Sequence, residues 1–163
     1  MMSVRKAKAP TISTIDSLEH LASRLLVGGD GNFSFYDRPP QVAGTIRSGD
    51  VANWIATAAT PFGWVLFWSK YMGCLTAREH FLLWADRELQ KRKIKPEHSI
   101  YLKHLVANNF CHGQKLSAKR IAKNLRVGRN NTAVKYVGIL DKILYVASIS
   151  EEDLGRLVRK ITR

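Results

Sequence analysis

Between positions 116 and 140 the sequence reads LSAKRIAKNLRVGRNNTAVKYVGIL, with cations and amides between regularly spaced apolar residues. Lys and Arg side chains pair with phosphate oxygens, and an Asn amide can form two hydrogen bonds with the edge of an adenine. The stretch contains no acidic residue, and no nucleophile, base and orienting group stand together in it. These residue types therefore indicate binding of a nucleic acid rather than catalysis.

The charge of the whole chain also favours a polyanionic partner. The 163 residues have a formal net charge of +13, and residues 1–86 hold 8 Lys/Arg and 7 Asp/Glu. Residues 87–163 hold 18 and 6, and 12 of these basic residues lie in 91–135 with a single acid, Glu97. A segment with so much charge of one sign repels itself unless it lies near an anion, and counterion release from phosphates favours Lys/Arg contacts. The alternatives to a nucleic-acid partner are an anionic membrane, an acidic protein, or a basic surface that only keeps the protein soluble.

The apolar spacing in this stretch predicts two helices joined by a turn. Ser117 can cap a short helix over 118–124, with Ile121 and Leu125 pointing inward. Gly128 then permits a turn that other residues would strain. The second helix begins at about Asn130, and its inward residues are Val134, Val137, Leu140, Ile143 and Leu144.

The segment IAKNLRVGRNNTAV resembles the IA-x-x-L-x-V…V core of bacterial helix-turn-helix and winged-helix DNA-binding domains. The resemblance covers only residues ~116–144. Two departures from the family pattern are visible. Arg126 stands where the turn glycine usually lies, and the interval from Val127 to Val134 is about two residues longer than usual.

In this family the second helix enters the major groove and the first crosses the backbone. The resemblance implies base contacts from the leading end of the second helix: Asn130, Asn131, Thr132 and Lys135. It implies phosphate contacts from the flanking cations: Lys115, Lys119, Arg120, Lys123, Arg126 and Arg129. The following segment, 143–148, is either a small β-wing or a continuation of the helix.

The rest of the chain predicts further helices. Residues 13–26 have helical spacing and stop at a Gly–Gly pair, and residues 28–50 read as a loop with a short strand at 33–36. Two apolar helices are expected over 51–59 and 61–74. A capping box formed by Thr76 and Glu79 would open the next helix, whose inward residues are Phe81, Trp84, Ala85 and Leu89.

Pro96 is suited to the first position of another helix, which Gly113 would end. Its expected apolar face consists of Ile100, Tyr101, Leu105, Val106 and Phe110. A last, separate helix would begin near Ser150, which forms a capping pattern with Asp153. The fold class is therefore mainly α, a compact helical bundle.

Other candidate sites are weaker. Cys74 and Cys111 match neither a disulfide framework nor a zinc motif, and His98 and His104 would face different sides of one helix. The run RLLVGGDGNFSF resembles a methyltransferase-like nucleotide loop, but the helix that must follow is missing. We expect no cofactor, no metal and no enzymatic activity. Residues 51–68 carry no charge, but a Pro-Phe-Gly turn interrupts them, so a membrane span is not expected.

These features predict a flexible basic arm at 1–12, a helical packing or dimerisation part at 13–95 and a basic helix-turn-helix part at 96–163. The four tryptophans, Trp54, Trp64, Trp68 and Trp84, are expected in the core or at a dimer face. The predicted function is that of a cytoplasmic regulator of transcription that binds duplex DNA, like small bacterial, plasmid or phage regulators. The alternatives are an accessory nucleic-acid binder in RNA binding, replication or plasmid transfer, an enzyme acting on nucleic acid, and a membrane-peripheral protein.

Overall fold

A computed structural model describes residues 18–19 and 60–162, with the side chains of the last two residues of that range left aside. Several expected elements lie outside the described residues: the arm at 1–12, most of the helix at 13–26, the loop and strand within 28–50 and the helix at 51–59. Leu18 and Glu19 are helical.

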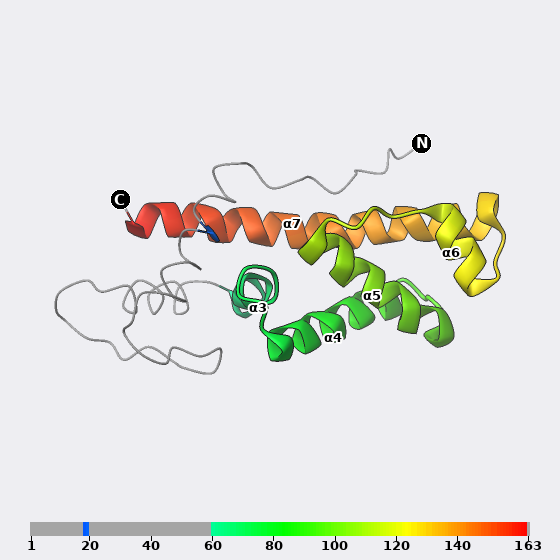
Figure 1. Cartoon of the computed structure of the whole chain (residues 1–163), viewed down its shortest axis with the longest axis horizontal. Helices are drawn as coiled ribbons and strands as arrows, with labels where there is room; N and C mark the ends of the chain where they lie inside the picture. Colours follow the sequence, from blue (N-terminus) through cyan, green and yellow to red (C-terminus); the bar gives the residue numbers. More distant parts are fainter. Residues whose placement is uncertain (1–17, 20–59, 163) are drawn as a thin grey trace. The chain divides into compact units, whose positions relative to one another are not determined.

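The described chain is helical and contains no strand, which confirms the mainly α fold class. Its elements, shown in Figure 1, are α3 (Pro61–Lys70), α4 (Leu75–Lys91), α5 (Pro96–His112), α6 (Ala118–Leu125), the π-helical turn η1 (Arg129–Ala133) and α7 (Val134–Thr162). Residues 143–148 belong to α7, so they continue the helix and form no β-wing. The expected separate helix from Ser150 is wrong, because that residue lies in the middle of α7.

The contacts divide the described chain into two compact units. We call residues 79–148 the basic unit, and residues 60–78 together with 149–162 and Leu18–Glu19 the aromatic unit. Helices α4 and α7 each contribute residues to both units.

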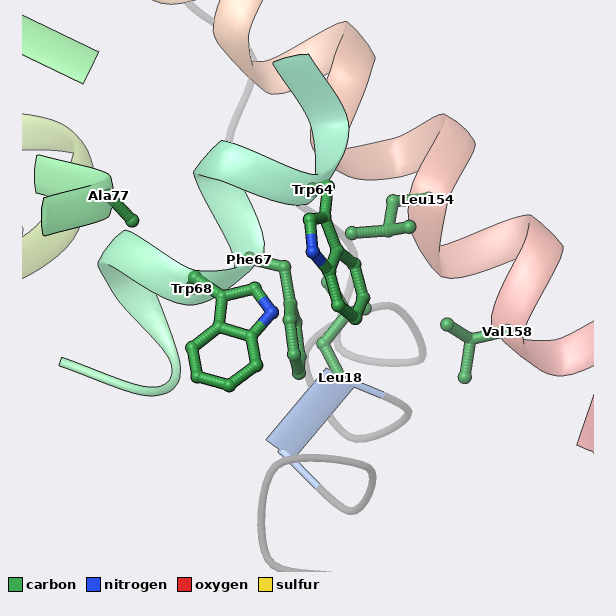
Figure 2. Packing of buried hydrophobic residues seen from close by; sticks show 7 residues of the cluster. All are labelled: Leu18, Trp64, Phe67, Trp68, Ala77, Leu154 and Val158. Atoms are coloured by element: carbon green, nitrogen blue, oxygen red, sulfur yellow. The ribbon is translucent and has the colours of Figure 1, made fainter. Parts of the chain in front are cut away.

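The aromatic unit has a core built around α3. Trp64, Phe67 and Trp68 lie among Leu18, Ala77, Leu154 and Val158, and all seven side chains are buried. Figure 2 shows the three rings on α3, with Leu154 and Val158 on α7. The Trp64 and Phe67 rings stack with centroids 5.6 Å apart, a geometry that adds to the stabilisation from burying their area.

A buried acid sits in the same unit. Glu151 is 1% exposed, and its Oε1 lies 2.8 Å from the ammonium of Lys70 and accepts a hydrogen bond from the Tyr71 hydroxyl. Burial, followed by the negative charge of Glu151 and this hydrogen bond, raises the pKa of the Tyr71 phenol far above its usual range. Both donors act on Oε1, and Oε2 is buried without a hydrogen-bond partner among the described residues, so they offset only part of the cost of removing the carboxylate from water.

The basic unit has its own core. Phe81 of α4 stacks on Phe110 of α5 at 5.4 Å, and Ala85 and Leu89 continue the buried side of α4 as expected. His98 Nδ1 of α5 lies 2.6 Å from the hydroxyl of Tyr136 in α7. Ile100, expected inside, is 63% exposed, because its neighbours Ser99 and Leu102 occupy the buried side of α5.

Helix ends follow local sequence at some positions and depart from it at others. Pro96 is the first residue of α5, and Gly113 ends it in the left-handed conformation, both as expected. Helix α3 ends at Lys70, earlier than the predicted position 74. The capping box at Thr76 is wrong, since α4 begins at Leu75 and Thr76 lies inside its first turn.

Candidate nucleic-acid interface

Helix α6 presents cations on one side and packs with the other. The hydroxyl of Ser117 accepts a hydrogen bond from the Arg120 amide at 3.3 Å, which confirms the predicted N-cap. Ile121 is fully buried, and Lys119, Arg120 and Lys123 are exposed. The 3.6-residue period explains this separation, because these cations lie between about 100° and 200° away from Ile121 around the helix.

The turn after α6 contains the first unusual backbone conformation of the site. Arg126 adopts the left-handed conformation, with φ 54° and ψ 47°, and its amide donates to the carbonyl of Ala122. This is the position at which the sequence departs from the family's turn glycine, so an arginine here has the backbone that glycine adopts most readily. Gly128, to which we assigned the turn, instead has an ordinary φ of −64°.

The second helix begins with a π turn, η1, which packs against α6 (Figure 1). The Ala133 amide donates to the Gly128 carbonyl at 2.9 Å, five residues earlier. A π turn holds one residue more than an α turn. This extra residue accounts for part of the interval from Val127 to Val134, which is longer than in the family pattern. The amides of residues 129–132 are not used by the first helical bond, and the N-cap residue, Gly128, has no side chain that could accept from them.

The structure places the ten predicted contact residues on α6, η1, the start of α7 and the loops before and after α6. Thr132 is half-buried, and the other nine are exposed: Lys115, Lys119, Arg120, Lys123, Arg126, Arg129, Asn130, Asn131 and Lys135. Their roles toward a ligand remain predictions.

One residue was assigned to the wrong side of α7. Val134 was expected to point inward, but its side chain is 52% exposed. Ala133 and Tyr136 are the buried residues of this turn, and their burial sets the rotation of the helix about its axis. The apolar spacing therefore did not predict that Val134 lies on the exposed side of the second helix, close to its start. The small Ala133 was the available signal, since an alanine can sit against α6 without displacing it.

Helix α5 supports both helices of the candidate interface. The Asn124 side-chain amide of α6 donates to the Tyr101 hydroxyl of α5 at 2.9 Å. The contact between His98 and Tyr136 connects α5 to α7 in the same way. Burial and then the nearby charge of Glu97 raise the pKa of the Tyr136 phenol above its usual value. These two contacts connect α5 to α6 and to α7.

The charge of this region is not neutralised from within the described part of the chain. No acidic residue occurs between Glu97 and Asp141, whereas the 28 residues of 113–140 contain seven cations. None of these seven forms an ion pair with another described residue, in contrast to Lys70, Lys91, Arg92 and Arg156, which pair with Glu151, Glu88, Glu88 and Asp153. The positive field over α6 and η1 is therefore available to an external anion.

Other sites are not supported among the described residues. They include no group of three or more potential metal ligands, and none of their helices has the length and apolarity to cross a bilayer. Cys74 and Cys111 are both half-buried. Trp64 and Trp68 are buried in the core as expected, whereas Trp84 is half-buried and Trp54 lies outside the described residues.

Comparison with protein-family models, with curated proteins and with solved structures gives no match to this chain.

Proposed function

We propose that the protein binds duplex DNA through α6, η1 and the start of α7, and that it regulates transcription. The leading end of the second helix enters the major groove in this proposal. Asn130, Asn131 and Lys135 face the bases there, and Thr132 lies at the edge of the contact. The cations of α6 and of the turn face the phosphates.

The observation that carries the proposal is the exposed, uncapped start of the second helix beside unopposed cations. Helix amides without internal partners and the positive end of the helix dipole favour an anion at this position. The left-handed backbone of Arg126 further supports the resemblance, since a glycine in the family pattern would adopt that conformation.

The test replaces Arg129 and Asn131 by Ala in one variant and measures its affinity for duplexes selected from a random pool. Loss of one phosphate contact and one base contact should weaken binding by about tenfold or more. Circular dichroism should remain helical, because both side chains are exposed. Fluorescence anisotropy at two salt concentrations separates the base contact from the phosphate contact.

A matched control replaces Arg87 and Gln90 of α4 by Ala. Both are exposed in the basic unit, and the variant loses the same charge and a similar amide. Its affinity should equal that of the wild type. Equal binding of the wild type to unrelated duplexes, or stronger binding to RNA, would contradict a regulator and favour an accessory nucleic-acid binder.

A further inference from the structure

The exposed face of α7 near its start combines residues that the fold itself does not require. Val134 and Gly138 are four residues apart in α7 and lie on the same side of this helix, and the exposed Asn131 of η1 comes just before them in the chain. Lys135 borders this side and is exposed. Ala133 and Tyr136 on the opposite side are buried, which directs the side with Val134 away from the core of the basic unit.

Val134 is an apolar side chain on a cationic and polar surface. Its exposed fraction of 52% leaves about half of its surface in water, and it is not among the buried residues of the described part of the chain. A single exposed valine is common on protein surfaces, so its exposure alone indicates nothing. Its position three residues after Asn131 and directly before Lys135 places it within the proposed DNA contact.

Gly138 gives an independent indication that something approaches this face. A Cβ at Gly138 would meet no atom within 4 Å among the described residues, and the glycine has no positive φ. The fold therefore has no steric need for glycine, although glycine inside a helix is less favourable than alanine. Absence of a side chain one turn beyond Val134 leaves room for close approach by a partner.

We infer that Val134 contacts the C5 methyl group of a thymine in the major groove, and that Gly138 marks where the duplex comes nearest to α7. This inference rests on the proposed function and deepens it. Thymine is the only base of ordinary DNA with a methyl group in the major groove, and an apolar side chain recognises it by contact. The bound site therefore contains a thymine next to the base read by Asn131.

The experiment uses the full chain and the duplex that it selects most strongly from a random pool. Each thymine in turn is replaced by deoxyuridine, which removes only the methyl group. One replacement should weaken wild-type binding by about fourfold, the effect expected for one buried methyl group. The variant Val134→Ala should bind the thymine and uracil duplexes equally.

The matched control is Val146→Ala, because Val146 is also an exposed valine of α7 in the basic unit but lies three turns further along the helix. This control should keep the fourfold preference for thymine. A Gly138→Ala variant should lose affinity several-fold while its unfolding midpoint rises, a combination that a merely structural glycine would not produce.

The outcomes separate the inference from the function on which it rests. Selective duplex binding that no uracil replacement affects, or a preference for thymine that survives in Val134→Ala, would overturn the inference and leave the function intact. If Gly138→Ala binds the duplex with unchanged affinity, the inference that the duplex comes nearest to α7 at Gly138 is wrong. Failure of the wild type to select any duplex would overturn both.

Discussion

The aromatic unit and the basic unit differ in how certain charged side chains are buried and paired. In the aromatic unit, Glu151 is buried and held by Lys70 and Tyr71. In the basic unit, the cations of α6 and η1 are exposed, and none forms an ion pair among the described residues. A buried charge requires partners from its own chain, whereas an exposed charge left unpaired remains available to another molecule.

We therefore expect substitutions in the aromatic core to change stability, and substitutions of exposed residues in the proposed interface to change ligand binding. Phe67 illustrates the first group, because it stacks on both Trp64 and Tyr71 and is 1% exposed. Arg126 illustrates the second, because it keeps a left-handed backbone and an exposed guanidinium in the proposed interface. Variants that separate stability from affinity test this expectation.

The largest effect is expected from Phe67→Ala. Removing this ring leaves a cavity in the aromatic core and should lower the free energy of unfolding by about 3–5 kcal/mol. Urea unfolding followed by tryptophan fluorescence measures the loss. Affinity for duplex DNA, measured well below the unfolding transition, should not change. The control Leu75→Ala removes a residue that is 76% exposed and should have little effect on either quantity.

A smaller effect is expected from Tyr71→Phe, and it depends on pH. In the unfolded chain the phenol ionises from about pH 10 upward, whereas the raised pKa keeps it protonated in the folded chain. The folded state then binds more protons, so its stability falls as pH rises above about 10.

Between pH 9 and 11 the wild type should lose up to about 1 kcal/mol more stability than Tyr71→Phe, allowing for partial solvent screening of this half-buried ring. Urea unfolding at several pH values measures the difference. Parallel curves for the two proteins would show that Tyr71 contributes nothing to the pH dependence.

The smallest change in stability is expected from Arg126→Gly, and here stability and affinity should move in opposite directions. Glycine relieves the left-handed backbone and should stabilise the protein by about 1 kcal/mol. Loss of one phosphate contact should weaken duplex binding and reduce the slope of its salt dependence by about one.

Lys93 provides the control, because it is the other non-glycine residue with positive φ among the described residues and is exposed in the basic unit. Lys93→Gly should give a similar gain in stability with no change in the salt slope. An equal loss of affinity in both variants would show that overall charge, rather than position, governs binding.

The local sequence predicted those features that depend on neighbouring residues. Ser117 caps α6, Pro96 begins α5 and Gly113 ends it, because each of these effects acts within one helical turn. Three of the inward residues predicted for α4, Phe81, Ala85 and Leu89, are fully buried, whereas the fourth, Trp84, is half-buried. Predictions of helix boundaries failed where the local sequence is compatible with two structures. At Ser150 the capping pattern predicted the start of a helix, but this residue lies within a continuous helix.

By itself, the sequence determined the helical class, the ends of several helices and the uneven distribution of charge, because these follow from residue type, spacing and composition. Only the tertiary structure decided that Arg126, and not Gly128, has the left-handed backbone, and that Val134 faces outward. Both outcomes depend on how α6 packs against η1 and α7. Ala133 of η1 and Tyr136, which contacts His98 of α5, are buried, and this fixes the rotation of the second helix, which the period of the apolar residues leaves open by about one position.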